Sequence, residues 1–279
     1  MASKTLIIGA CGQIGSELTH TLRKQLGKDN VIASDVNERN QDVVKSGPFE
    51  IVDAKSFKAI KACVEKHNVG TVYLMAALLS ATGEKYPQKA WNLNMTSLLH
   101  VLNLAKDKVI NRIFWPSSIA VFGPNTPKTD TPQMTVTDPT TVYGITKLAG
   151  ERWCDYYNRN YGVDVRSIRY PGIISWKTLP GGGTTDYAVD IFHKAISQGH
   201  YDCFLKKDSE LPMMFMDDAV KATLNIMKAV TIIENAPLLA SKAGNDMLLM
   251  PIDETETINS ILREMKINSN YKIIMAQAA

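Results

Sequence analysis

The sequence has few cysteines, no long hydrophobic run and no block of like charge. Its 279 residues include four cysteines, far apart and without CxxC spacing, which argues against a disulfide framework and a zinc site and favours a reducing compartment. The five histidines form no HxxxH or HExxH pattern, so we expect no metal. No apolar run reaches the roughly 18 residues that span a membrane, and KTLIIGA begins too early to leave room for a secretion signal.

The composition is that of an ordinary globular chain. Hydrophobic residues make up 45% and charged residues 21%, and 31 basic against 28 acidic side chains give a net charge of +3. This balance does not indicate a nucleic-acid surface. The length allows one large α/β domain or two smaller units. We expect a cytoplasmic protein, or a mitochondrial matrix protein if a transit peptide has been removed.

Short apolar segments alternate with helical periodicity along the first 170 residues. The apolar segments lie at residues 4–10, 30–36, 71–77, 112–118 and 163–170. Buried strands that alternate with helices form parallel sheets covered on both faces. The sequence therefore predicts an α/β fold with a Rossmann-type, doubly wound parallel sheet.

A helix is predicted over residues 139–161. We expect Asp138 to cap its N-terminus, Pro139 to take its first position and Gly162 to end it, because these residue types favour these positions. Within this helix Tyr143 and Lys147 are four positions apart, so their side chains project from one face. Taken alone, the pair is better explained as an ordinary Tyr and Lys on a half-buried surface than as an acid/base pair.

The segment GACGQIG directly follows the first apolar run. Its glycines, Gly9, Gly12 and Gly15, allow a tight turn and bring backbone N–H groups close to a pyrophosphate at a helix N-terminus. Asp35 ends the second apolar run, 20 residues after Gly15, where a carboxylate accepts hydrogen bonds from the adenosine ribose and repels a 2′-phosphate. The pattern predicts NAD as the cofactor, although the nearby Arg39 leaves NADP open.

A dinucleotide at this position gives the Tyr143 and Lys147 pair a context. If NAD lies across the carboxyl ends of the strands, Ser118 brings a hydroxyl to the nicotinamide beside this pair. A tyrosine with a pKa of about 10 acts as a base near neutral pH only if that pKa falls by roughly 3 units. We expect Lys147 and the positive nicotinamide to lower it by stabilising the phenolate, while Ser118 holds the substrate oxygen.

Three motifs in this order, GxxGxxG, SSxxVFG and YxxxK, resemble the extended short-chain dehydrogenase/reductase family over at least residues 4–229. The resemblance implies Tyr143 as the catalytic base, Lys147 and Ser118 as its partners, and Asn94 as the residue that supports the site and its water. The family pattern S-x-x-V-[YF]-G selects Ser118, rather than Ser117, as the catalytic hydroxyl.

The same resemblance implies further contacts with the cofactor. Asp53 is expected to meet the adenine, and Pro171 and Ile173 to line the nicotinamide. The resemblance also counts the three glycines, Asp35, Tyr143 and Lys147 among the residues that bind the cofactor. It adds five further positions, which are Gln13, Ile14, Ala54, Ala76 and Ser117.

Several segments, including LLSATGE and PGGGTTDYAVDIFHKA, resemble the threonine dehydrogenase branch of this family. The resemblance implies that a homodimer without metal oxidises L-threonine with NAD to 2-amino-3-ketobutyrate, on a route towards glycine or aminoacetone. It also implies that Ser80, Thr184 and Thr185 contact the substrate, together with Ser118 and Tyr143. Without the resemblance, Thr184 or Thr185 could simply cap the helix that follows.

The organisation predicted for the whole chain has two parts. Residues 1–174 form the NAD-binding Rossmann domain, and residues 175–279 form mainly a substrate-binding lobe, of which 215–229 pack back on the first domain. The segment from about residue 230 departs from the family pattern, which leaves open a nucleotide-sugar epimerase or reductase, or a catalytically impaired NAD-binding homologue. We expect dimer contacts through residues 88–106 and 139–161.

Overall fold

The computed structural model describes residues 3–175, 177, 183, 185–203, 205–206 and 211–229. Within these ranges, six strands form one sheet in the order β3-β2-β1-β4-β5-β7, and every neighbouring pair is parallel. These strands are β1 (Lys4–Ile8), β2 (Val31–Asp35), β3 (Phe49–Ile51), β4 (Val69–Leu74), β5 (Arg112–Phe114) and β7 (Asp164–Arg166). The predicted Rossmann-type sheet is confirmed.

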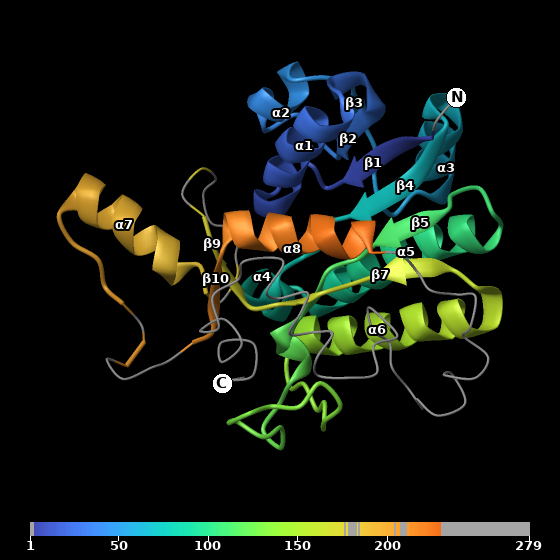
Figure 1. The fold of residues 1–279 in the computed structure, drawn as a ribbon. Coiled ribbons are helices and arrows are strands. Elements are labelled where there is room, and N and C mark those ends of the chain that lie inside the picture. The colour runs from blue at the N-terminus through green and yellow to red at the C-terminus, as the bar shows by residue number, and fades with distance from the viewer. Residues whose placement is uncertain are drawn as a thin grey trace.

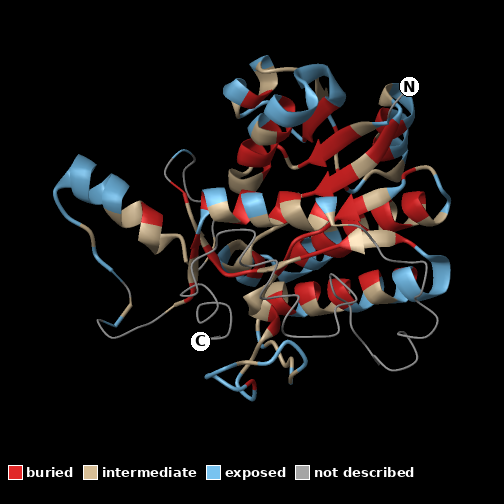
Figure 2. Cartoon of the chain, viewed as in Figure 1, coloured by how far each residue is buried: buried red, intermediate tan, exposed pale blue. Residues whose placement is uncertain are grey.

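Helices cover both faces of this sheet (Figure 1). One face packs against α1 (Gln13–Leu26), α2 (Gln41–Lys45) and α8 (Met216–Lys228), and the other against α3 (Phe57–His67), α5 (Pro87–Lys106) and α6 (Val142–Tyr161). Alternation along β1 divides the core, because Leu6 and Ile8 face the second set and Ile7 faces the first. Buried residues therefore lie along the sheet and on the inner sides of the helices (Figure 2).

Two of the predicted strands are each broken in the structure. The run 112–118 divides into β5 and β6 (Ser117–Ser118), and the run 163–170 divides into β7 and β8 (Arg169–Tyr170). Pro116 lies at the first break, where it has no N–H to donate to a ladder. Strands β6 and β8 then pair with each other in a small separate sheet, which carries Ser118 away from the main sheet and towards the site.

The N-terminus of α6 differs from the expected one. Asp138 and Pro139 lie ahead of the helix, and Thr141 is its cap, since the Thr141 hydroxyl accepts a hydrogen bond of 3.0 Å from the Gly144 N–H. The Asp138 carboxylate instead accepts hydrogen bonds from the backbone and side chain of Asn125. The Asp-Pro pair thus fixes the preceding loop rather than the helix.

Most of the remaining elements lie around the carboxyl ends of the strands, whereas the short turn at Lys28–Asn30 directly precedes β2 at its amino end. Strand β9 (Gly172–Ile174) pairs in parallel with β10 (Met213–Phe215). The elements between and before them are α4 (Ser80–Lys85), α7 (Tyr187–Gln198) and the short 3-10 turns η1 (Lys28–Asn30) and η2 (Ile119–Val121). Figure 1 shows α7 standing away from the sheet, with Phe192 and Ile196 exposed.

Helix α8 is fixed to the sheet at its carboxyl end. Arg166 donates hydrogen bonds from its guanidinium to the carbonyls of Ile226 and Ala229. Asp164 accepts from Arg166 and also from Arg112, so the charges on β5 and β7 form one network.

The predicted division of the chain into two domains stays a prediction. Among the described residues, no helix combines the length and apolar character needed to cross a membrane.

Candidate active site

The turn between β1 and α1 depends on its glycines. Gly9 has a φ of +90°, and a Cβ placed there would lie 2.6 Å from the Ala76 nitrogen. A Cβ on Gly15 would overlap the carbonyl oxygen of Gly9. Gly12 has room for a Cβ, whose nearest neighbour would be 3.4 Å away, and Gly12 lines a cavity. Two of the three glycines are therefore required by packing within the protein itself.

Asp35 is fixed at the carboxyl end of β2. Its carboxylate accepts hydrogen bonds from the Cys11 N–H at 3.0 Å and from the Val36 N–H at 2.8 Å, and the side chain is buried. Arg39 lines the same end of the cavity. The carboxylate is thus held beside the glycine turn, with an opposite charge in the same region.

A single cavity of about 940 Å³ extends from this end to the helix that carries Tyr143. Its walls include sixteen of the residues predicted as site residues, which are Gly9, Gly12, Gln13, Ile14, Gly15, Asp35, Ala54, Ala76, Ser80, Ser117, Ser118, Tyr143, Lys147, Pro171, Ile173 and Thr185. Two others do not line it: Asp53 turns towards Lys55, and Asn94 lies behind the wall. Thr184 is outside the described residues.

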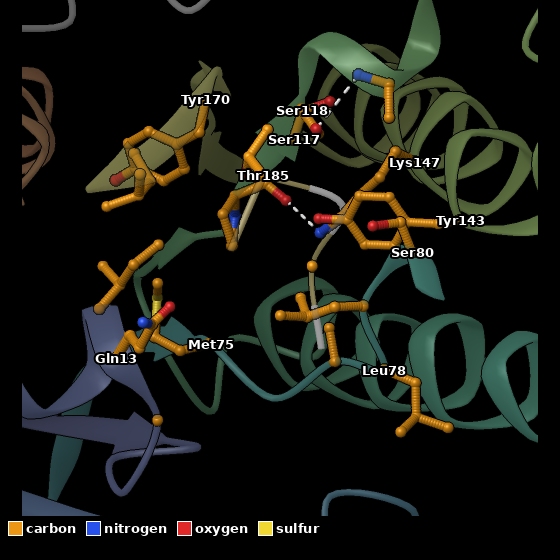
Figure 3. A pocket seen from close by; sticks show the side chains of 18 of the residues that line it. Gln13, Met75, Leu78, Ser80, Ser117, Ser118, Tyr143, Lys147, Tyr170 and Thr185 are labelled. Atoms are coloured by element: carbon orange, nitrogen blue, oxygen red, sulfur yellow. Dashed lines mark hydrogen bonds between the residues drawn. The ribbon is translucent and has the colours of Figure 1, made fainter. Parts of the chain in front are cut away.

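The first turns of α6 and the end of β6 bring the reactive side chains together. Ser118 hydrogen-bonds with the Tyr143 phenol, and the Lys147 nitrogen lies 5.4 Å from the centre of the Tyr143 ring. Figure 3 shows the three side chains converging from two elements at one end of the cavity. The arrangement suits removal of a proton from a hydroxyl bound beside Tyr143.

Burial shifts the pKa of both Tyr143 and Lys147 in the direction that favours the neutral form. Burial raises the pKa of Tyr143 to about 12, while the Ser118 hydrogen bond acts in the opposite direction. Burial lowers the pKa of Lys147 to about 7, against the smaller influence of Cys154 and Glu151. The protein without the cofactor therefore does not lower the phenol pKa, and the expected lowering by Lys147 together with the nicotinamide stays a prediction. Desolvation is the reason for both shifts, because it penalises the charged form of each group.

Asn94 supports the site from α5. Its side-chain oxygen accepts from the Leu78 N–H at 2.9 Å, and its nitrogen donates to the Leu78 carbonyl and to the Thr146 hydroxyl. Asn94 is buried, so these contacts join α5, α6 and the segment before Ser80. The residue can fix the positions of its neighbours, and the structure gives it no place on the cavity wall.

A buried acidic residue behind the site was missed by the sequence analysis. Glu151 accepts a hydrogen bond of 2.6 Å from the Ser117 hydroxyl and forms a two-pronged ion pair with Arg169. This contact engages the Ser117 hydroxyl with Glu151, and the choice of Ser118 as the catalytic hydroxyl stays a prediction. The i, i+4 spacing of Lys147 and Glu151 was visible in the sequence, whereas the partners 34 and 18 positions away were not.

The end of the cavity that holds Tyr143 also carries hydroxyls and charges of both signs (Figure 3). Ser80 begins α4, Thr185 packs against the backbone of Gly172, and Lys128 and Asp186 also line this end. The Asp186 carboxylate accepts from the Gly183 N–H at 2.7 Å. An acidic side chain at the start of α7 makes this helix terminus poorly suited to binding a carboxylate.

Comparison with protein families gives a match over residues 5–235 to the NAD dependent epimerase/dehydratase family. The chain belongs to this family. An uncharacterized epimerase/dehydratase of Staphylococcus saprophyticus is 49% identical over 81% of this chain and 71% of its own length. A GalE-like L-threonine dehydrogenase from Cupriavidus necator, solved in its holo form, is 49% identical with a TM-score of 0.78, covering 98% of this chain and 88% of that one. A monomeric L-threonine 3-dehydrogenase from a metagenome is 47% identical over 81% of this chain and 72% of its own, with a TM-score of 0.77.

As a member of the epimerase/dehydratase family, the protein is an NAD-dependent oxidoreductase. The cavity fits this cofactor. Gly12 lines it without a side chain that would block the approach of a pyrophosphate, and the buried carboxylate of Asp35 lies at the same end of the cavity as the glycine turn. The first turn of α1 has no side-chain cap, which leaves backbone N–H groups for an anion. Within the described residues, no cluster of His, Cys, Asp or Glu side chains has the form of a metal site.

Proposed function

We propose that the protein oxidises L-threonine to 2-amino-3-ketobutyrate with NAD. The observation that carries the proposal is the meeting of Ser118, Tyr143 and Lys147 in one cavity with the hydroxyl-bearing Ser80 and Thr185. The similarity to the two threonine dehydrogenases, at nearly half of all positions, supports this substrate over others of the family.

In the proposed reaction Tyr143 removes the proton of the threonine β-hydroxyl. Ser118, already hydrogen-bonded to the phenol, donates to the substrate oxygen and holds it at the base. The ammonium of Lys147 stabilises the phenolate, and the positive nicotinamide is needed in addition, since burial alone raises the phenol pKa. Bound NAD supplies the acceptor for the hydride that leaves the β-carbon.

The predicted site residues receive roles in the same proposal. The cofactor is held by the glycine turn and Asp35, with the other cavity-lining cofactor positions around it, and Asn94 orients α6 through Thr146. Asp53 lies next to the cavity-lining Ala54 rather than in the wall, so we assign it an indirect role at the adenine end.

The amino-acid end of the substrate is proposed to lie beside Tyr143, among Ser80, Thr185 and the charged residues of the same cavity. A zwitterion needs both charges, and Lys128 and Asp186 supply them there: the ammonium of Lys128 suits the carboxylate, and the carboxylate of Asp186 suits the substrate ammonium. Ser80 and Thr185 add hydroxyls, as the sequence predicted.

The purified chain is expected to form NADH from NAD in the presence of L-threonine. L-Serine lacks the β-methyl group and L-allo-threonine has the opposite β-configuration, so both should react more slowly. UDP-glucose is the matched alternative for a nucleotide-sugar enzyme of the same family. NADH from threonine supports the proposal, and conversion of the nucleotide-sugar alone overturns it.

Absence of turnover together with calorimetric binding of NAD would indicate the impaired homologue. The segment that prompted this alternative, residues 230–279, lies outside the described residues.

We also propose that the protein is a homodimer that uses α5 and α6. The exposed aromatic residues of these helices include Trp91, Trp153 and Tyr156, and exposed aromatics of this kind are enriched in interfaces. One similar dehydrogenase is described as monomeric, so the similarity alone does not decide the assembly.

Light scattering should give twice the chain mass for the wild type. Tyr156→Glu should give a monomer, because it places a charge among the aromatic side chains of α6. Phe192→Glu on α7, another exposed aromatic position, should remain dimeric. A monomeric wild type contradicts the proposal.

A further inference from the structure

The Lys147 ammonium is enclosed by protein on the side away from the cavity. The residue is only 2% exposed, and its nitrogen donates a hydrogen bond of 2.5 Å to the carbonyl of Pro116. An ammonium has three N–H donors, so one carbonyl does not explain by itself how the charge is kept in this buried position. The titratable groups around it are Tyr143, Glu151 and Cys154, all on α6.

The face of a tryptophan supplies the missing contact. The Lys147 nitrogen lies 4.6 Å from the centre of the Trp115 ring, within the distance at which a cation is attracted to an indole face. Trp115 and Pro116 are adjacent in the chain, so one short segment provides both the ring and the carbonyl.

Trp115 is held between β7 and α6. Its backbone N–H donates to the Arg166 carbonyl at 2.9 Å, which extends the pairing of β5 with β7. The side chain then points to the sheet face opposite to that of Phe114 and lies against α6. A Cβ on Gly150 would come 2.5 Å from the ring atom Cζ2, so the glycine leaves the slot that the indole fills.

We propose that Trp115 is a positioning residue for the reaction, which holds the charged Lys147 side chain at the cavity wall through the face of its indole. The proposal rests on the function assigned to Lys147 above. It differs from a packing role in one respect: the effect must follow the negative potential of the ring face and not the volume of the ring.

Fluorinated tryptophans separate these two properties, because fluorine withdraws electron density from the ring with little change in shape. Mono-, di- and trifluorotryptophan are incorporated at position 115, and the same series at Trp153 is the matched control. Trp153 lies on the outer side of α6 against Tyr156 and Tyr157. Lysines carry ¹³C at the ε-carbon, and Lys147→Met identifies the Lys147 signal.

The midpoint of the Lys147 titration is expected to fall stepwise with each fluorine at position 115, by about one pH unit over the series. The sign follows from the weaker attraction, which leaves the ammonium less stable relative to the neutral amine. The series at Trp153 should leave the midpoint unchanged. A midpoint that stays constant through the Trp115 series overturns the proposal, whether or not the melting temperature changes.

Activity provides a second and separable result. If threonine is the substrate, the pH profile of kcat/KM should move in step with the NMR midpoint. Failure of the proposed function appears as no NADH from threonine with any variant, and the NMR titration still decides the role of Trp115. NADH formation with no stepwise shift retains the function and removes the positioning role.

Discussion

Replacing Tyr143 by phenylalanine is expected to lower kcat for NADH formation by about 100-fold to 10,000-fold, the usual contribution of a positioned base. The substitution removes one oxygen and keeps the ring, so the contact with the Lys147 side chain at 5.4 Å is retained. NAD affinity, measured by calorimetry, should change little, because Gln13, next to the glycine turn, lies on the opposite side of the cavity from Tyr143 (Figure 3).

Tyr157→Phe is the matched control for this substitution. Tyr157 lies on the same helix and donates its hydroxyl to Asn103 at 2.8 Å, away from the cavity. Its removal costs a hydrogen bond of about 1 kcal/mol in stability and should leave kcat unchanged. Turnover of Tyr143→Phe close to that of the wild type would contradict the assignment of Tyr143 as the base.

The second large effect is expected at Gly15. Gly15→Ala improves the intrinsic helix propensity of α1 by about 1 kcal/mol, yet its methyl group must displace the Gly9 carbonyl. Moving the turn by about 1 Å is enough to cost roughly 100-fold in a positioned contact. We therefore expect NAD affinity to fall by about 100-fold and the melting temperature to fall as well, measured by calorimetry and by thermal unfolding.

Two other glycines separate the fold from the cofactor contact. Gly12→Ala meets only one atom at 3.4 Å, so it should unfold near the wild-type temperature and still bind NAD less tightly. Gly162→Ala at the end of α6, with a φ of 65° and nothing within 4 Å, should cost about 1 kcal/mol in stability and leave NAD binding intact. Wild-type NAD affinity in Gly15→Ala would contradict the role of this turn.

The parts of the site whose arrangement could be predicted from the sequence are those encoded within a few positions. The glycine turn sits between one strand and one helix, and the spacing of Tyr143 and Lys147 is a single helical turn. The alternation of apolar strands and helices likewise gave the parallel sheet, because each strand is buried on both faces. The edge strand β3 escaped notice because it has three residues, of which Ile51 is exposed.

The rest depends on contacts between distant parts of the chain. Whether Asp138 caps a helix or binds Asn125 is decided by a loop that brings the two together, and the Asp-Pro signal is the same in both cases. Similarly, the pKa of Tyr143 depends on how deeply the phenol is buried, and the spacing of residues in the sequence does not determine this burial. Trp115 was part of a predicted strand, and its position over Lys147 follows only from the packing of that strand on α6.

The pairing of β9 with β10 affects how this protein can change in evolution. Gly172 lies opposite Met213 and Ile174 opposite Phe215. Because β9 and β10 are short neighbouring strands, the segment that connects them begins and ends close together. The entropy cost of closing a loop rises only slowly with its length. The residues between the two strands can therefore be exchanged, lengthened or shortened as an inserted module, and a new substrate range can arise without any change in the dinucleotide turn or in α6.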